Sequence, residues 1–308
     1  SQPSLTEKDI KDARFVLDHD VDWIALSFVR KEKDILDLRK IIAAHPNNAR
    51  IIAKIEKPEA LEEIDEIISA SDAVMVARGD LGVEVDFHKV PLIQKDIIKR
   101  CHRKSKPVIV ATQMMESMIT NPTPTRAEAN DVANAVLDGA DSVMLSGETS
   151  VGKYPVDTIR NMQMIIDSTE TEEYIYYKEH QSGPGAKNFL ADAICLNAVQ
   201  LAEQVNAAAI VTLTHSGFTA IRMSSHRPKA PIFTFTMNED LINDLSLVWG
   251  VRTYYFGECQ NINDYIVYTE EFLVSQNLLK KGDLVVHVGS IPILEKGKTN
   301  MLKLTRVS

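Results

Sequence analysis

The sequence is poor in the features that mark specialised protein classes. Its three cysteines, Cys101, Cys195 and Cys259, lie far apart without metal-ligand spacing, and an odd number suits reduced thiols better than a disulfide framework. No apolar run approaches the roughly 18 to 20 residues that a membrane span requires. The residues from Ser1 to Lys8 form neither the basic nor the apolar part of a signal peptide. The sequence therefore predicts a cytoplasmic protein.

A surplus of positive charge is lacking as well. The formal net charge is −9 and the pI is near 5.4, whereas a face that binds nucleic acid needs clustered lysine and arginine. With 308 residues, of which 44% are apolar and 25% are charged, the chain has the composition of a globular protein with material for about two hydrophobic cores. We therefore expect binding neither to nucleic acid nor to a membrane.

Short β-branched runs recur through the first half of the chain, and charged stretches with helical spacing separate them. The runs are apolar on both faces, as buried parallel strands are, and their intervals fit a barrel of the triosephosphate isomerase (TIM) type. Only five units are visible, whereas a (βα)8 barrel needs eight, so either three units are missing from the front or this half forms an open sheet. The expected strands are Trp23–Val29, Ile51–Ile55, Ala73–Ala77, Val108–Thr112 and Ser142–Leu145, and Leu61, Ile64, Ile67 and Ile68 mark one of the helices between them.

The pattern changes after a helix expected at residues 159–168. The segment 172–185 is rich in turn-formers and is typical of a connector. The short loop before the last strand predicts an antiparallel hairpin at one edge of the second sheet. The second half should contain a long helix at about 186–204 and strands at 208–214, 231–236, 251–256, 284–289 and 301–305. The predicted fold class is thus α/β, with a partial (βα)8 TIM-type barrel over residues 1–175 and an open α/β domain over residues 176–308.

Two carboxylates follow neighbouring strands of the predicted barrel. Glu56 ends the run Arg50–Ile55, and Asp80 lies just past Ala73–Ala77. Hard divalent ions such as Mg²⁺ take oxygen ligands and keep positions open for substrate oxygens, while Lys54 can neutralise a second negative charge. This set suits phosphoryl transfer or enolate chemistry. Alternatively, Lys54 and Glu56 form a structural salt bridge and Asp80 is a helix N-cap.

Further turns place polar groups at the same edge. The segment Arg78–Gly82 has glycines that allow backbone N–H groups to face an anion. Thr112 places a hydroxyl at the end of the fourth strand, although such a threonine is also a common helix cap. Ser146–Thr149 repeats the arrangement after the fifth strand, and Arg126, in a polar loop that leads into a helix, is a candidate for a subunit contact.

Several long motifs, in this order, resemble those of pyruvate kinase. The similarity runs over the whole chain, and it implies the fourth to eighth barrel strands and the carboxyl-terminal domain of that family. The three first strands and the lid domain inserted after the third are not recognised, so the chain is expected to be a carboxyl-terminal portion that is inactive by itself. The motifs are Ile52–Glu56, Met75–Gly82, Ala111–Met114, Pro124–Glu128, Asp131–Ala135 and Met144–Thr149.

The resemblance implies phosphoryl transfer from phosphoenolpyruvate to ADP, which gives pyruvate and ATP in the last step of glycolysis, with Mg²⁺ or Mn²⁺. It makes Lys54 the catalytic group that stabilises the phosphoryl group and the enolate, and it makes Glu56 and Asp80 the metal ligands. The backbone amides of Gly79 and Asp80 would hold the substrate carboxylate, and Thr112 would lie beside the enolate carbon. The family also uses K⁺, whose ligands are expected outside this chain, and forms tetramers, so a homo-oligomer is expected.

A loop in the second half carries a candidate phosphate site. Thr214, Ser216, Gly217 and Thr219 bring hydroxyls and a glycine to the start of a helix, and such groups bind phosphate readily. Ser216 as an ordinary N-cap is the alternative. By the resemblance, this loop holds the phosphate of a sugar-phosphate activator. The loop Gly289–Gly297 lacks the tryptophan and arginine of a fructose bisphosphate site, which favours a sugar monophosphate.

Two other functions stay open at this point. A metal-dependent barrel lyase or aldolase of pyruvate–enolate chemistry would also use a lysine and two carboxylates, but it leaves the second half of the chain unexplained. A non-catalytic module for sugar-phosphate binding or subunit assembly would need none of the barrel residues.

Overall fold

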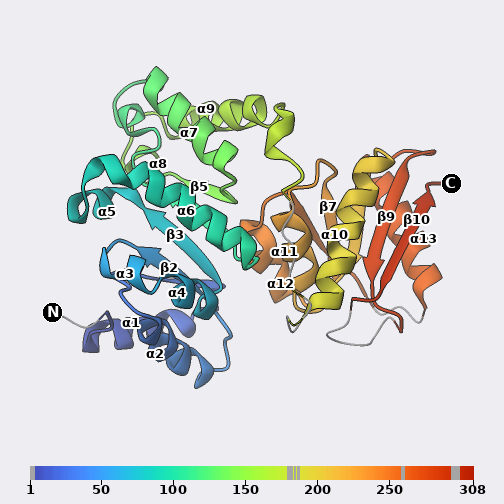
Figure 1. Cartoon of the computed structure of the whole chain (residues 1–308), viewed down its shortest axis with the longest axis horizontal. Coiled ribbons are helices and arrows are strands. Elements are labelled where there is room, and N and C mark those ends of the chain that lie inside the picture. The colour runs from blue at the N-terminus through green and yellow to red at the C-terminus, as the bar shows by residue number, and fades with distance from the viewer. Residues whose placement is uncertain (1–3, 179–182, 184, 186–187, 258–260, 293–298) are drawn as a thin grey trace. The chain divides into compact units, whose positions relative to one another are not determined.

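The computed structural model describes residues 4–178, 183, 185, 188–257, 261–292 and 299–308. The chain divides into two compact units, Ser1–Ile175 and Tyr176–Ser308, and each is treated separately below (Figure 1). Across the ranges described, no helix is long and apolar enough to cross a membrane.

Unit 1 is built around one parallel sheet. Its strands pair in chain order, β1-β2-β3-β4-β5, with every pair parallel. The predicted α/β class and five βα units are therefore confirmed. The strands are β1 (Trp23–Leu26), β2 (Arg50–Ile55), β3 (Ala73–Ala77), β4 (Val108–Ala111) and β5 (Ser142–Met144). The helices are α1 (Glu7–Leu17), α2 (Glu32–Ala43), α3 (Glu59–Glu62), α4 (Ile64–Ala70), α5 (Arg78–Glu84), α6 (Val90–Arg103), α7 (Arg126–Asp138), α8 (Gly147–Ser150) and α9 (Pro155–Thr169).

Alternation along β2 decides which side chains face the helices. Ile51, Ala53 and Ile55 are fully buried in the core that contains Ile35 of α2 and Ile67 of α4. Because successive side chains of a strand point to opposite faces, Lys54 lies on the other face of the sheet.

Two predicted strands end earlier than expected, and the cause is local. Phe28 and Thr112 take φ angles of 56° and 68°, which a strand cannot accommodate, so β1 ends at Leu26 and β4 at Ala111. The single helix predicted around Leu61–Ile68 is wrong in one detail. Glu63 leaves the helical region (φ −113°, ψ 28°) and separates α3 from α4.

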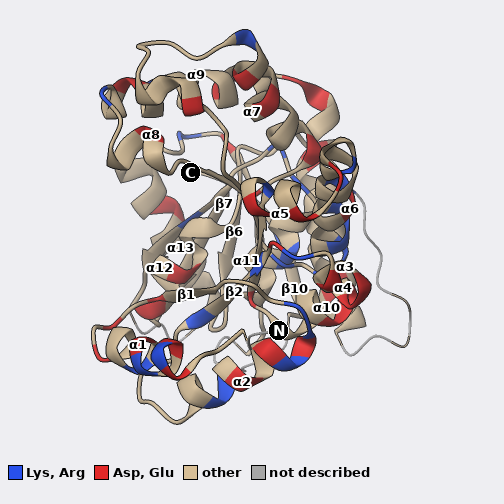
Figure 2. Cartoon of the chain, turned by 90° about the vertical axis from the view of Figure 1, so that its left-hand side faces the viewer, with Lys and Arg blue, Asp and Glu red and all other residues tan. Residues whose placement is uncertain are grey.

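Charged side chains are mixed on several helices of unit 1. Figure 2 shows acidic and basic residues close together on α1 and α2, and mainly acidic residues on α4 and α7. Positive and negative charges are therefore interspersed on α1 and α2.

Unit 2 is an open α/β layer. Its sheet has the order β10-β9-β6-β7-β8, in which only the β10–β9 pair is antiparallel, as predicted. Helices α10 and α11 pack on one face of the sheet, and α13 packs on the other. The strands are β6 (Ala209–Leu213), β7 (Ile232–Thr236), β8 (Val251–Tyr255), β9 (Leu284–Gly289) and β10 (Met301–Arg306), and the helices are α10 (Phe189–Gln204), α11 (Phe218–Ser225), α12 (Asp240–Asp244) and α13 (Ile262–Ser275).

The cysteines follow the expectation of reduced thiols where they can be seen. Cys101 and Cys195 are buried and free. Burial raises the pKa of Cys195 to about 12, and burial likewise raises the pKa of Cys101, so neither is a ready nucleophile. Cys259 lies outside the described residues.

Candidate functional site

Lys54 and Glu56 form a buried ion pair at the carboxyl end of β2. The Lys54 Nζ lies 2.6 Å from Glu56 Oε1 and donates to Ser27 Oγ at 2.8 Å. The Phe28 backbone N–H donates to the other Glu56 oxygen at 2.7 Å. The Glu56 side chain is 1% exposed and that of Lys54 is 23% exposed. Each charge therefore has a fixed position with little freedom to turn toward water.

Asp80 lies at the same edge of the sheet as Glu56. Strands β2 and β3 pair with Ile55 opposite Val76, and α5 follows β3 without an intervening loop. Asp80 is exposed, and within the described parts of the chain its carboxylate makes no hydrogen bond or ion pair. The alternative role as a helix N-cap is wrong, because Ala77 holds the cap position and Asp80 lies in the first turn of α5.

Thr112 lies against Gly79. The Gly79 N–H donates to Thr112 Oγ1 at 2.7 Å, and that hydroxyl donates to the Ala111 carbonyl at 2.6 Å. A Cβ on Gly79 would come within 3.3 Å of Thr112 Oγ1, so this close approach favours glycine. Thr112 is not a helix cap, because Met115 precedes the next helical turn. The predicted contacts of Gly79 and Thr112 with substrate stay predictions, since the structure pairs these two groups with each other.

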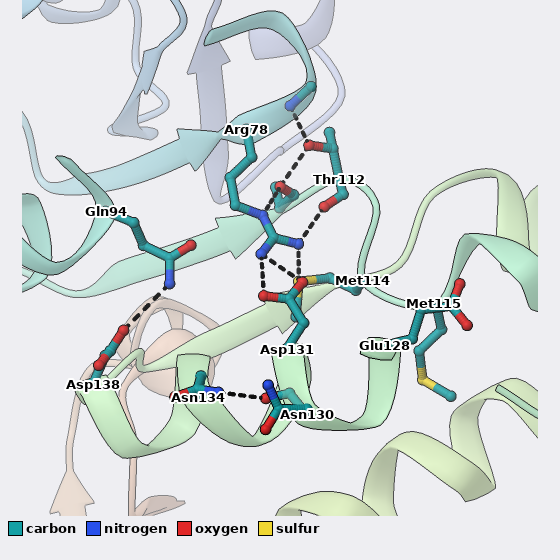
Figure 3. A network of polar contacts seen from close by, with 12 residues as sticks. Arg78, Gln94, Thr112, Met114, Met115, Glu128, Asn130, Asp131, Asn134 and Asp138 are labelled. Atoms are coloured by element: carbon teal, nitrogen blue, oxygen red, sulfur yellow. Dashed lines mark hydrogen bonds and ion pairs between the residues drawn. The ribbon is translucent and has the colours of Figure 1, made fainter. Parts of the chain in front are cut away.

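Arg78 connects this turn to α7, as Figure 3 shows. Its Nη1 lies 2.7 and 2.6 Å from the two carboxylate oxygens of Asp131, and its Nη2 donates to the Thr112 carbonyl at 2.6 Å. Its Nε donates to the Ala111 carbonyl at 3.4 Å. The Arg78 side chain is 10% exposed. One guanidinium thus holds both carbonyls at the end of β4.

Glu148 fixes the next turn. Its carboxylate, in a side chain that is almost fully buried, accepts from the Met115 N–H at 3.2 Å and from the Ser146 N–H at 2.8 Å. The turns after β4 and β5 are therefore joined by a single side chain.

Glu128 stabilises the start of α7. It accepts from the backbone and hydroxyl groups of Ser117 and Thr125. Burial alone would raise the pKa of Glu128, but these hydrogen bonds outweigh burial and hold it below its usual range. Arg126, the first residue of α7, comes directly after Thr125 and is exposed to solvent.

A cavity of about 690 Å³ borders the Arg78 network. Its lining includes Gly79, Gln113 and Asp131, and it continues between α6 and α7. Lys54, Glu56 and Asp80 do not line it, so it is separate from the proposed metal ligands.

The candidate phosphate loop of unit 2 precedes α11. The Gly217 N–H donates to Thr214 Oγ1 at 3.1 Å, and Gly217 has a φ of 82° that glycine adopts readily. Ser216 is exposed, and its alternative role as an N-cap is wrong, because Gly217 holds that position. Thr219 Oγ1 lies 3.0 Å from Thr299 Oγ1. Within the loop Gly289–Gly297, which was compared above with a fructose bisphosphate site, residues 293–297 lie outside the described residues.

Sequence reasoning missed four residues of the unit 1 site. Arg78, Asp131 and Glu148 lay inside quoted motifs without a role, and Ser27 was not considered. For Arg78 and Glu148, the signal available in the sequence is a charged residue just after a strand end, although its partner cannot be read from sequence. Arg78 and Asp131, for example, are 53 positions apart.

Comparison with known proteins gives a consistent family. The family models for the barrel domain and the alpha/beta domain of pyruvate kinase match residues 1–159 and 192–305. Curated pyruvate kinases of Geobacillus stearothermophilus and Clostridium acetobutylicum are 44% and 41% identical over 309 and 304 residues, covering 99% and 98% of this chain. A solved pyruvate kinase structure from Cryptosporidium parvum is 37% identical, with a TM-score of 0.92 over 100% of this chain.

The chain is shorter than these relatives. It spans 52% and 64% of the two curated proteins and 63% of the solved one. The matches nevertheless include both domain models, in the order found here. The chain belongs to the pyruvate kinase family.

Proposed function

We propose that this chain carries the metal-binding and enolate-stabilising part of a pyruvate kinase, which transfers the phosphoryl group of phosphoenolpyruvate to ADP and releases pyruvate and ATP. The observation that carries the proposal is the fixed Lys54–Glu56 pair and the exposed carboxylate of Asp80, at the carboxyl ends of adjacent strands. Active sites of barrel enzymes are built at this end of the strands.

The residues fit a hard divalent cation such as Mg²⁺ or Mn²⁺. Glu56 and Asp80 offer carboxylate oxygens: each Glu56 oxygen meets one donor, Lys54 or the Phe28 amide, and keeps a second lone pair, while the Asp80 carboxylate is exposed. Two protein ligands leave positions for substrate oxygens and water, which is the usual arrangement for Mg²⁺ at phosphate sites. When bound, the ion would supply positive charge at the phosphoryl and enolate oxygens.

Lys54 would supply the second positive charge. Its ammonium is held by Ser27 and Glu56, so little reorganisation is needed when negative charge develops on the substrate. The substrate carboxylate would take the Gly79 and Asp80 amides, and Thr112 would lie beside the enolate carbon. No described residue is assigned to K⁺.

Asp80→Asn tests the metal assignment. An amide keeps the shape of the side chain but removes the charge that a hard cation selects, so we expect Mn²⁺ affinity to fall at least about tenfold, equivalent to ~1.4 kcal/mol. Mn²⁺ titration of the purified chain, followed by electron paramagnetic resonance, measures this. Glu66→Gln removes the same charge from an exposed position on α4 and should leave affinity unchanged. Equal affinity in wild type and Asp80→Asn would remove Asp80 from the ligands.

The loop of unit 2 is proposed as the site of a sugar monophosphate effector, built from Thr214, Ser216, Gly217 and Thr219. A ligand that binds only the folded state raises the melting temperature. Ribose 5-phosphate or glucose 6-phosphate should therefore raise it in wild type but not in Ser216→Asp, whose charge repels phosphate. The exposed Ser216 tolerates the change, and Ser216→Asn serves as the uncharged control of equal size. An equal shift in Ser216→Asp and Ser216→Asn would place the effector elsewhere.

Assembly and location follow from the same proposal. As part of a glycolytic enzyme, the chain would act in the cytoplasm and form a homo-oligomer, with tetramer as the expected state. The exposed Arg126 at the start of α7 is the candidate subunit contact.

The other two functions are less well supported. A lyase or aldolase leaves the match to the alpha/beta domain of pyruvate kinase unexplained. A purely non-catalytic module leaves the buried Lys54–Glu56 pair without a role. Following pyruvate after addition of phosphoenolpyruvate, ADP, Mg²⁺ and K⁺ separates an enzyme from such a module, provided that the protein tested also carries the remaining barrel strands.

A further inference from the structure

We propose that Arg78 is a positioning residue that holds Thr112 in place for the substrate. The inference rests on the proposed function, in which Thr112 lies beside the enolate carbon. Arg78 would act through the backbone of the turn after β4, without touching substrate itself.

The turn after β4 needs support because its backbone is strained. Thr112 and Gln113 have φ angles of 68° and 53°. A positive φ is a true outlier for a β-branched residue such as threonine, and a backbone held in this way is strained. Some other interaction must hold the turn in this conformation.

Arg78 supplies that interaction. Its guanidinium donates to the carbonyls of Ala111 and Thr112, the two residues where the strand ends and the turn begins. Asp131 on α7 fixes the guanidinium from the other side. Adjacent residues of α5 therefore hold Thr112 at two points, since Arg78 binds its carbonyl and the Gly79 amide binds its hydroxyl.

A simple structural ion pair between α5 and α7 explains less. The Arg78 side chain is 10% exposed but that of Asp131 is 37% exposed, so water screens part of this ion pair. An ion pair alone would also leave unexplained why a second guanidinium nitrogen, Nη2, donates to the Thr112 carbonyl. Lysine, with one nitrogen, cannot take the place of this planar fork.

The first experiment reads the position of Thr112 without substrate. In Arg78→Met, the turn should relax, and the Gly79 amide should lose its hydrogen bond to Thr112. We expect the Gly79 amide resonance to shift and its hydrogen exchange to accelerate at least about tenfold, close to the effect of Thr112→Val, which removes the acceptor. Arg39→Met is the control, because Arg39 also binds a carboxylate and a backbone carbonyl, those of Asp72 and Ala70, and it should leave Gly79 unchanged. An unchanged Gly79 amide in Arg78→Met would overturn the proposal.

The second experiment asks whether the position of Thr112 affects the affinity for phosphoenolpyruvate. With Mn²⁺ present, phosphoenolpyruvate affinity should fall at least about tenfold in Arg78→Met and in Thr112→Val, and the double variant should lose no more than either single one, because both changes remove the same placement. Additive losses would overturn the proposal by giving Arg78 an independent role.

Arg78→Lys and Asp131→Asn repeat the test should Arg78→Met fail to fold. Failure of wild type to bind phosphoenolpyruvate would overturn the proposed function, while the Gly79 result would still decide the role of Arg78 in holding the turn.

Discussion

In a protein that joins this chain to the remaining barrel strands of a pyruvate kinase, replacing Lys54 with methionine should abolish phosphoryl transfer while divalent-metal affinity stays largely unchanged. Methionine keeps the unbranched stem of the side chain but removes the charge aimed at the developing negative oxygens. The loss of one preorganised electrostatic group lowers turnover by about 10²–10³-fold. Pyruvate release and Mn²⁺ titration measure the two effects separately.

Lys57→Met is the matched control for this variant. Lys57 lies three positions away, has a side chain that is 22% exposed, and pairs with Glu84. It should leave turnover unchanged. If Lys54→Met kept its turnover within about tenfold, a difference of ~1.4 kcal/mol, Lys54 would be only a structural partner of Glu56.

The same two variants should differ in stability, a result that does not depend on turnover. Lys54→Met leaves Glu56, 1% exposed, with the Phe28 amide as its remaining donor. Leaving the buried Glu56 carboxylate without its cation costs about 3–5 kcal/mol, whereas the Lys57–Glu84 pair, whose Glu84 side chain is 39% exposed, contributes about 0–1 kcal/mol. Urea unfolding should show this difference, and Lys54→Met combined with Glu56→Gln should recover most of the loss. Equal stability in the two lysine variants would contradict this account.

The architecture of unit 1 could be predicted because its signals are local. Each β-branched run buries itself in a parallel sheet, and Ile51 and Ala53 show the pattern. Because consecutive βα units place their strands side by side, the order of the sheet followed from the order of the runs. The positions of Lys54, Glu56 and Asp80 at one edge followed from the same rule.

The finer geometry could not be predicted, because it depends on partners that are distant in sequence. The Thr112 hydroxyl meets the amide of Gly79, 33 positions away, and the Glu56 carboxylate meets the amide of Phe28, 28 positions away. Neither Phe28 nor Thr112 is a residue that suggests a positive φ. Because Asp and Ser favour N-cap positions, local rules also offered Asp80 and Ser216 as helix caps. In the structure, Ala77 and Gly217 hold the two cap positions, and neither helix has a side-chain cap.

Removing the Glu148 side chain should strongly destabilise unit 1. Glu148→Ala leaves the buried N–H group of Met115 without its acceptor, whereas the N–H group of Ser146, an exposed residue, can turn to water. An unsatisfied buried group costs about 1–3 kcal/mol, so we expect a loss of about 1–3 kcal/mol in the free energy of unfolding. Glu148→Gln keeps one carbonyl oxygen as an acceptor and should lose less.

Urea unfolding and hydrogen exchange together test the role of Glu148. In Glu148→Ala, the amides of Met115 and Ser146 should exchange faster than in wild type, because they open to water more often. Glu116→Ala removes an exposed carboxylate from the same stretch and should change neither measurement. Equal behaviour of the two alanine variants would show that the turns after β4 and β5 are held by other contacts. A selective loss in Glu148→Ala would instead mean that this buried carboxylate keeps the turn that carries Thr112 against its neighbour.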